Sequence, residues 1–267
     1  MGFLECLTKT EQKDKFNLKD KFKTANATSN SLALAENDFQ PFIEANSFNG
    51  EQNPIYSPEY VNATLALNHP MRFIAKYLNE STIENAIKNN SNIKRILKSE
   101  KLEVKFDIQN VKDIIMSHLI PTAKRAQDIY TKMGHTKKEP TYAYLTQAAL
   151  LHDIGKVFIP REILNKKGRL TPKERSIIEL HNKLSYEILK TTDLNPQAAI
   201  LAYEHHNYEG NLKKNHENQA LTIADVYSAL RESRPYKKPI SHIGAKTILY
   251  DMGTKGQLDT RYVSYVN

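Results

Sequence analysis

The spacing of apolar residues changes near Asp107, and from there the chain has the pattern of long amphipathic helices. Between residues 111 and 133 apolar side chains recur with the 3.6-residue period of an α-helix. Proline directly follows Thr171 and Asn195, and proline is common in the first turn of a helix. The pattern predicts an all-α bundle without strands, with helices over residues 111–133, 141–151, 171–188, 195–206 and 219–232.

The earlier part of the chain divides into a polar segment and a helical region. Residues 1–50 are rich in Asn, Lys, Thr and Ser and have little periodicity, so we expect them to be poorly structured. Residues 51–108 are predicted to be mostly helical, with a capping box over Ser81–Glu84. This smaller domain has no catalytic group that we can identify, so we expect a regulatory or interaction role. The chemistry is predicted to lie in a third region, residues 109–267.

Composition narrows the class of protein. Apolar residues make up 40% and charged residues 25% of the 267 positions, which is typical of a globular chain. No apolar run approaches the roughly 20 residues needed to span a bilayer, and residues 1–15 lack the apolar core of a signal peptide. We therefore expect a cytoplasmic protein without a membrane span. The single cysteine, Cys6, excludes a cysteine-based zinc site, so a metal would need imidazole and carboxylate ligands.

The net charge of +8 is spread along the chain, because Lys and Arg alternate with Asp and Glu. A diffuse positive field favours an anionic substrate such as a nucleotide, or an acidic partner. Solubility alone would explain the same charge. Aromatic residues do not alternate with a basic stripe, so a nucleic-acid groove is not expected.

The clearest chemical signal is the adjacent pair His152 and Asp153 in an apolar stretch. Burying an imidazole beside a carboxylate costs free energy unless something compensates both groups. Five further residues with metal-binding side chains occur at helix-compatible positions: His118, His181, His205, His206 and Asp225. Taken singly, a histidine on an apolar face is commonly a core residue, and one at a helix C-terminus can stabilise the helix dipole. Taken together, these residues predict a metal centre.

These residues suffice for a two-metal hydrolytic site, which needs a bridging carboxylate, terminal ligands and an open position for water. Asp153 is the natural bridge, because its neighbour His152 can bind one of the ions. The predicted first site consists of His118, His152, Asp153 and Asp225, and the second of Asp153, His181, His205 and His206. A hydroxide between the two ions would be the nucleophile. Imidazole and carboxylate ligands without thiolate favour iron or manganese.

The pair belongs to a longer motif. The residues are His152-Asp153-Ile154-Gly155-Lys156, followed by Ile159-Pro160, Ile163-Leu164, Lys166, Gly168, Leu170-Thr171, Glu174 and His181. A later segment runs from Ile223 to Leu230 and continues as Arg234-Pro235-Tyr236-Lys237. Over residues 111 to about 265 the chain thereby resembles the HD superfamily, and specifically the HD-GYP family.

The resemblance implies a helical bundle, a centre of two or three metal ions, and phosphodiesterase action on cyclic di-GMP or a related cyclic dinucleotide. It also implies that Lys156 contacts a metal-bound phosphate or the nucleophile. Arg234 and Lys237 would hold the substrate phosphate.

Two features depart from the family pattern. The Gly-Tyr-Pro triplet that should follow the paired histidines is missing from the segment Asn207–Leu212, and the connection to Asp225 is short. That loop shapes the substrate pocket and is implicated in partner docking. The second departure is Ile114, one turn before His118, where members with three ions carry Glu. We therefore expect two ions.

Three functions stay open on the sequence. A phosphodiesterase for a cyclic dinucleotide, with cyclic di-GMP as the first choice, accounts for the complete ligand set. A catalytically silent domain that binds metal or nucleotide and regulates a signalling partner would account for the missing triplet. A shortened loop would also suit an HD phosphohydrolase acting on another nucleotide. Retention of every ligand favours an enzyme, because buried charges that lose their partners destabilise a fold.

Overall fold

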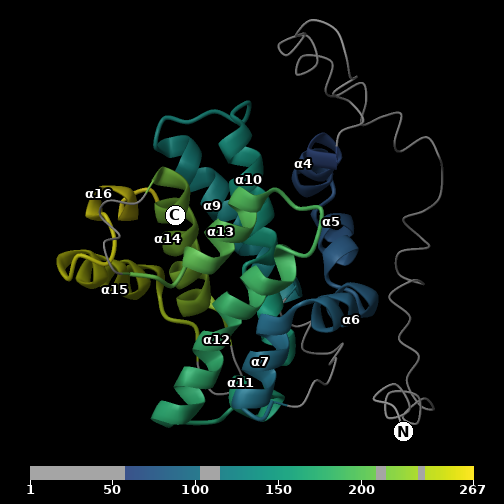
Figure 1. Ribbon diagram of the computed structural model, residues 1–267. Coiled ribbons are helices and arrows are strands. Elements are labelled where there is room, and N and C mark those ends of the chain that lie inside the picture. Colours follow the sequence, from purple (N-terminus) through teal and green to yellow (C-terminus); the bar gives the residue numbers. More distant parts are fainter. Residues whose placement is uncertain (1–57, 103–114, 209–214, 234–237) are drawn as a thin grey trace, which may run out of the picture. The chain divides into compact units, whose positions relative to one another are not determined.

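Every regular element in the part of the chain that the structure describes is helical (Figure 1). The computed structural model describes residues 58–102, 115–208, 215–233 and 238–267. These residues belong to one compact unit, and the predicted all-α class is confirmed. None of the described helices is both long and apolar enough to cross a membrane. The predicted polar segment, residues 1–50, lies outside the described residues.

Four short helices begin the described chain: α4 (Pro58–Asn68), α5 (Pro70–Tyr77), α6 (Glu80–Asn89) and α7 (Ser91–Ser99). The predicted capping box over Ser81–Glu84 is wrong. Asn79 is the N-cap of α6, and its side chain accepts a hydrogen bond from the backbone N–H of Thr82 at 2.9 Å. Asparagine is a strong N-cap, so the helix begins before the predicted box.

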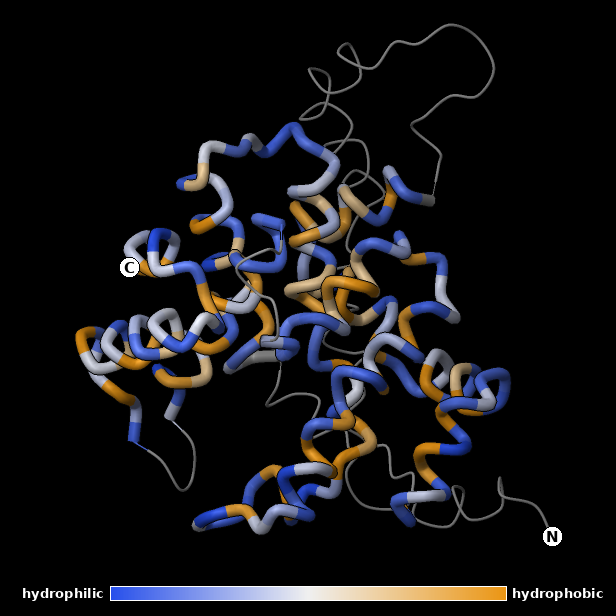
Figure 2. The backbone as a smooth tube through the Cα atoms, turned by 60° about the vertical axis from the view of Figure 1, so that its left-hand side comes forward, coloured by the Kyte–Doolittle hydropathy of each residue, from blue (hydrophilic) through white to orange (hydrophobic). Residues whose placement is uncertain are grey.

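These four helices pack on the later ones. Helices α4 and α5 contact α10, whereas α6 and α7 contact α12. Phe73, Ile83 and Ile93 are buried in the same hydrophobic core as the residues of α10. The helices on both sides of residue 108 therefore share one core. Hydrophobic and hydrophilic stretches are mixed along the described chain (Figure 2). The predicted domain boundary at this point stays a prediction.

Helix α10 (Pro140–Leu151) is the central helix of the unit. It contacts α9 (Ile120–Lys132), α13 (Pro196–Glu204) and α14 (His216–Arg231), which surround it in Figure 1. From Tyr142 to Leu151 nearly every residue is buried, and a helix that is apolar on all sides belongs in a core. Its end therefore carries His152 and Asp153 into the interior.

The helix predicted over residues 111–133 is not continuous where it is described. A π-helical turn, η2 (Ile115–Leu119), precedes α9, while residues 111–114 lie outside the described part. Pro121 has no N–H to donate to the carbonyl of Ser117, so one α-helical hydrogen bond is missing here. Single π turns often occur at functional sites, and this one contains His118.

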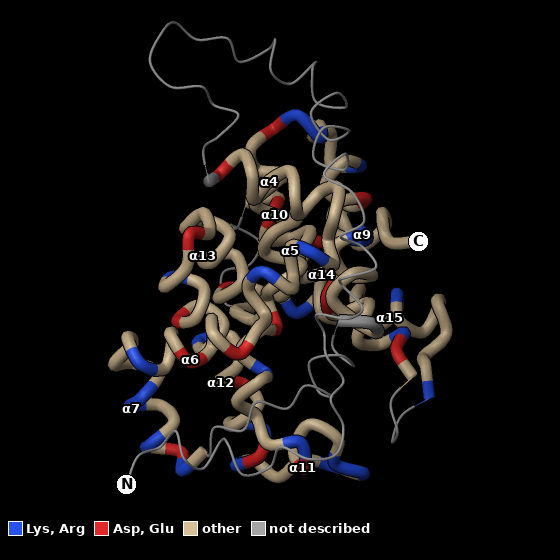
Figure 3. Tube along the Cα trace, turned by 90° about the vertical axis from the view of Figure 1, so that its right-hand side faces the viewer, with Lys and Arg blue, Asp and Glu red and all other residues tan. Residues whose placement is uncertain are grey.

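The later helix starts follow their capping residues. Thr171 and Glu174 form the predicted capping box of α12 (Pro172–Leu189), and Asn195 caps α13 as predicted. Helix α14 begins at His216, before the predicted Gln219, because Asn215 caps it. The remaining elements are η3 (Ile154–Phe158), α11 (Arg161–Leu164), α15 (His242–Thr254) and α16 (Thr260–Val263). Basic and acidic positions are intermixed along the described helices (Figure 3), in keeping with a diffuse charge.

Candidate metal centre

The seven predicted ligands come together from five parts of the fold. Their positions are His118 in η2, His152 and Asp153 directly after α10, His181 on α12, His205 and His206 directly after α13, and Asp225 on α14. All are buried except His206, whose side chain is 30% exposed. Burial of this many ionisable groups in one place requires compensation by partners or by a cation.

Four of these residues have the spacing of ligands around one ion. Nε2 of His118 lies 3.1 Å from Nε2 of His152 and 2.9 Å from Oδ1 of Asp225. It is 3.3 Å from Oδ2 of Asp153. His152 Nε2 is 3.5 Å from each of these two carboxylate oxygens. With metal–ligand bonds of about 2.1 Å, ligand atoms lie about 3.0 Å apart at right angles and about 3.4 Å apart in a tetrahedron.

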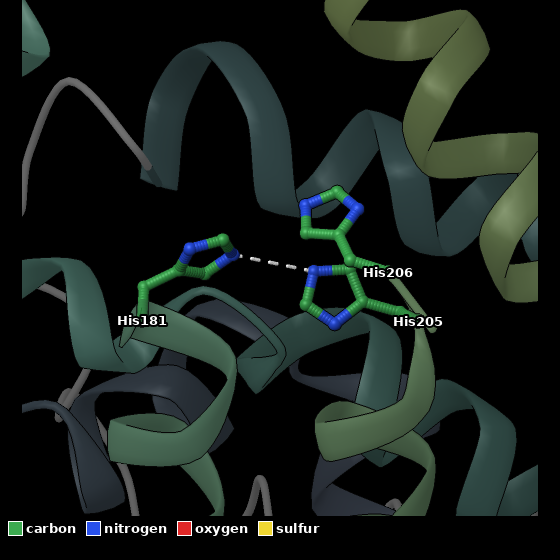
Figure 4. A group of neighbouring side chains, drawn as sticks. All are labelled: His181, His205 and His206. Atoms are coloured by element: carbon green, nitrogen blue, oxygen red, sulfur yellow. Dashed lines mark hydrogen bonds between the residues drawn. The ribbon is translucent and has the colours of Figure 1, made fainter. Parts of the chain in front are cut away.

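A second group surrounds the other oxygen of Asp153. His181 Nε2 lies 3.2 Å from Oδ1 of Asp153 and 3.4 Å from Nε2 of His205. The ring of His206 lies beside that of His205, and its Nδ1 is 3.7 Å from Oδ2 of Asp225. Figure 4 shows His181 facing the paired histidines across a short gap. Ligand atoms of the three rings all lie within 4.8 Å of one another, so this group too could hold an ion.

Hydrogen bonds fix the tautomer of three of the histidines. Nδ1 of His152, His181 and His205 donates to the backbone carbonyl three residues earlier, at 2.9, 2.5 and 2.7 Å respectively. A neutral ring with its proton on Nδ1 presents an unprotonated lone pair at Nε2. These lone pairs point toward each other and toward carboxylate oxygens, an arrangement that is repulsive unless a cation lies between them.

Asp153 is the residue that most directly requires a cation. Its Oδ1 is buried and accepts no hydrogen bond from the described residues, although it faces Nε2 of His181. Its Oδ2 faces His118 and accepts a hydrogen bond from Nζ of Lys156 at 2.5 Å. The two oxygens therefore serve different histidine groups, as in a carboxylate that bridges two ions. The donor set fits a divalent ion with mixed imidazole and carboxylate preference.

The two aspartates of the cluster are held in their charged form. Burial raises the pKa of Asp153, but the charge of Lys156, whose Nζ donates to Oδ2, outweighs it and holds the pKa well below its usual range. The pKa of Asp225 is also well below its usual range, because the hydrogen bond from His118 outweighs the effect of burial. Carboxylates in this state are ready to bind a cation.

The histidines divide into two electrostatic groups. Burial lowers the pKa of His205 well below its usual range and that of His206 to about 4, so both rings are neutral at pH 7. Burial also lowers the pKa of His118, but hydrogen bonds with Asp225 and Glu232 outweigh it and raise the pKa to about 9. Metal binding at His118 would therefore release a proton.

Two supporting residues were not predicted from the sequence. Glu232 directly follows α14, and its Oε1 lies 2.5 Å from Nδ1 of His118. Ser185 on α12 donates to the carbonyl of His152 at 2.6 Å and accepts from the N–H of Gly155 at 2.9 Å. Such contacts orient metal ligands from behind. Helical periodicity could have indicated both, because Ser185 is one turn after His181 and Glu232 is two turns after Asp225.

Some sequence predictions concern parts of the chain that the structure leaves out. Arg234 and Lys237, the expected phosphate-binding residues, lie outside the described residues. The same holds for Ile114 and for residues 209–214, where the Gly-Tyr-Pro triplet would be expected.

Comparison with known proteins places the chain in a family. The family profile described as HD domain matches residues 109–261. The cyclic di-GMP phosphodiesterase response regulator RpfG of Xanthomonas campestris is 32% identical over 117 residues, covering 40% of this chain and 31% of that protein. The 3'3'-cGAMP-specific phosphodiesterase 1 of Vibrio cholerae is 29% identical over 153 residues, covering 54% of this chain and 35% of that protein.

A solved structure shares the fold over most of the chain. An HDG"Y"P protein from Bdellovibrio bacteriovorus aligns with a TM-score of 0.50 and 14% sequence identity, covering 89% of this chain and 79% of that one. Fold and site together thus define the class of protein: an all-helical bundle with a buried cluster of histidine and aspartate side chains. The chain belongs to the HD domain family, and the resemblance to HD-GYP proteins is confirmed. It spans about a third of the length of the two curated relatives.

Proposed function

We propose that the chain is a metal-dependent phosphodiesterase that hydrolyses a cyclic dinucleotide, with cyclic di-GMP as the expected substrate. The observation that carries the proposal is the convergence of imidazole nitrogens on both oxygens of Asp153. Membership of the HD domain family and relatives named as phosphodiesterases for cyclic di-GMP and cGAMP support the same reaction class. Two divalent ions, iron or manganese, would occupy the two groups.

Each candidate site residue would have a separate role in this reaction. When bound, the two ions would supply a bridging hydroxide as the nucleophile and stabilise negative charge on the phosphate. Asp153 would hold both ions, and its hydrogen bond to Lys156 places an ammonium group at the edge of the cluster. Lys156 could then offset negative charge in the transition state. Arg234 and Lys237 would hold substrate phosphate.

The region before the metal centre would regulate the reaction. Residues 51–108 would form a regulatory or interaction region next to the catalytic region, residues 109–267, and would receive a signalling partner. Their helices pack directly on α10, which ends at His152, and on α12, which carries His181. A conformational change in residues 51–108 would therefore be transmitted to the metal ligands through these two helices. The proposed location is the cytoplasm, where cyclic dinucleotides act as signals.

A silent domain that binds metal or nucleotide and regulates a partner is the second candidate. The observation that favours it is the missing Gly-Tyr-Pro triplet in the segment after His206. An HD phosphohydrolase for another nucleotide would fit the same departure. All seven candidate ligands are retained and brought together, which favours catalysis, because a pocket freed from catalysis need not keep buried charges that cost stability when unpaired.

The test is hydrolysis of cyclic di-GMP by protein purified without oxygen and supplied with Mn²⁺ or Fe²⁺. Wild type is the reference for the variant Lys156→Met, which has a side chain of similar length but no charge. Turnover that falls at least about tenfold in this variant would support the proposal. Binding of cyclic di-GMP without turnover would favour the silent domain. Turnover of a different nucleotide alone would favour the third function.

A further inference from the structure

A second pair of histidines lies at the opposite end of α9 from His118. His135 follows the C-terminal end of α9, and His216 is the first residue of α14. Nε2 of His135 lies 2.6 Å from Nδ1 of His216. By the rise of about 1.5 Å per residue, the pair is roughly 20 Å from His118 along α9 and roughly 14 Å from Asp225 along α14. The proposed function makes no use of it.

Each ring of the pair is held from its far side by an oxygen. Nδ1 of His135 donates to Oε2 of Glu139 at 2.8 Å, and Nε2 of His216 lies 2.8 Å from the hydroxyl of Tyr262. Tyr130 is stacked on His135, with ring centroids 4.1 Å apart and an interplanar angle of 4°. Both rings are therefore fixed in orientation, and only their facing nitrogens are left for another partner.

The hydrogen bonds determine whether each of the facing nitrogens carries a proton or a lone pair. Glu139 only accepts, so His135 keeps its proton on Nδ1, and the neutral ring has a lone pair at Nε2. If His216 donates from Nε2 to the oxygen of Tyr262, its Nδ1 also presents a lone pair. The pair can then share either one proton or one metal ion. An outer carboxylate, such as Glu139 behind His135, is a usual support of a metal-binding imidazole.

We propose that His135 and His216 form a second site for a divalent transition-metal ion, separate from the catalytic cluster. With bonds of about 2.0 Å, two imidazole nitrogens lie about 2.8 Å apart in a square-planar complex and about 3.3 Å apart in a tetrahedral one. A small outward movement of the rings from 2.6 Å reaches either value. Imidazole ligands select Zn²⁺, Ni²⁺ or Cu²⁺ over Mg²⁺ and Ca²⁺.

The charges around the pair suit a cation. Glu139 accepts from His135, Glu217 is the neighbour of His216, and the carboxylate of Asp259 lies within electrostatic range of His216. Asp259 is itself paired with Arg261, at 2.6 Å. The side chain of His135 is 28% exposed, so an ion from solution has access.

An ion at this site would cross-link two segments, α14 and the segment that follows α9, whose helices lie next to or carry the catalytic ligands. Helices α9 and α14 pack against each other, with His118 just before α9 and Asp225 on α14. The site would link the α9–α10 connection to the start of α14, and through Tyr262 to α16. An ion that binds only the folded chain raises its melting temperature.

The experiment uses Zn²⁺ as the probe and the full chain with its catalytic cluster first saturated with Mn²⁺. Bound zinc per chain and the melting temperature are measured for wild type, His135→Gln, His216→Gln and the control His242→Gln. His242 faces the hydroxyl of Tyr227 and is part of neither cluster. We expect wild type and His242→Gln to bind one more Zn²⁺ than the other two variants, with a melting temperature several degrees higher in zinc.

Glu139→Gln is a further test, because it keeps both imidazoles but weakens the support behind His135. The proposal predicts that it binds the additional Zn²⁺ about 10 to 100 times more weakly than wild type. Equal zinc content in wild type and both histidine variants would overturn the proposal. So would a melting temperature that changes with pH but not with Zn²⁺, because the pair would then hold only a proton. Circular dichroism and retained Mn²⁺ show that each variant is folded.

Discussion

The imidazole of His118 and the carboxylate of Glu232 form a hydrogen-bonded pair, with 2.5 Å between Nδ1 and Oε1. Glu232 approaches from the end of α14, so the same helix supplies a ligand, Asp225, and the support of a second ligand. The side chain of Glu232 is 11% exposed, which strengthens its interaction with the ring. A carboxylate in this place increases the basicity of the opposite nitrogen and fixes the ring for metal binding.

Replacing this support should weaken metal binding without removing a ligand. We expect Glu232→Gln to lower the affinity for Mn²⁺ about 10- to 100-fold, because the amide keeps the size of the side chain but not its charge. Competition with a coloured chelator measures the affinity. Glu179→Gln, on the surface of α12, is the matched control and should be unchanged. Equal affinities for wild type and Glu232→Gln would contradict the role assigned to this carboxylate.

Gly155 should be intolerant of even a methyl group. A Cβ at this position would collide with the backbone of α12 at His181 and Ser185. Gly155→Ala should therefore push the turn after Asp153 away from α12, costing about 1–3 kcal/mol of unfolding free energy and weakening metal binding. Urea unfolding and metal titration measure the two effects.

Gly168→Ala is the control for this substitution. Gly168 has φ of +120°, but nothing lies near the position of its Cβ. It should lose stability through backbone strain alone and keep wild-type metal affinity. If Gly155→Ala kept wild-type metal affinity as well, the turn would not position the ligands as described.

Asp193 should make a pH-dependent contribution to stability. Burial raises its pKa, but hydrogen bonds from Lys76 and Tyr77, at 2.7 and 3.0 Å, outweigh this and lower the pKa. A carboxyl whose pKa is lowered by folding stabilises the fold above its ordinary pKa of 3.8 and loses that contribution as the pH falls through the lowered value. The side chain is 47% exposed, so the contribution is limited to about 1 kcal/mol.

The measurement is urea unfolding of wild type and Asp193→Asn at pH 7 and below pH 3. We expect the variant to be less stable at pH 7 and the difference to shrink at the lower pH. Asp251→Asn is the matched control, because Asp251 pairs with Lys255 on one exposed helix surface. Its effect should be smaller. A difference between Asp193→Asn and wild type that grows as the pH falls would contradict the expected stabilisation by the charged carboxylate.

The sequence predicted the ligands of the cluster better than the supports behind them. His152 and Asp153 stand out because two polar groups interrupt an apolar helix, and His181 and Asp225 follow helical periodicity. Glu232 was missed because a charged residue at a helix end has many ordinary explanations, and only the fold shows that it reaches His118. The π turn at His118 was likewise missed, because apolar periodicity does not distinguish a π turn from an α-helix.

Some helix starts could likewise be predicted from the sequence, and others could not. Thr171 with Glu174 gives a reciprocal cap that the sequence reveals, and the structure has it. Near α6 two capping solutions compete, Asn79 and the box at Ser81, and the sequence does not rank them. The packing of α4–α7 on α10 and α12 depends on contacts between distant segments, which local patterns do not encode.

The central claim is that Asp153 bridges two ions, and metal content tests it most directly. Wild type, His118→Ala, His181→Ala and Asp153→Ala are saturated with Mn²⁺, freed of excess ion, and measured for manganese per folded chain. The account predicts two ions in wild type, one in each histidine variant and none in Asp153→Ala, because Asp153 directs one oxygen at each group as the bridging ligand. A full complement, or one tightly bound ion, in Asp153→Ala would contradict the account.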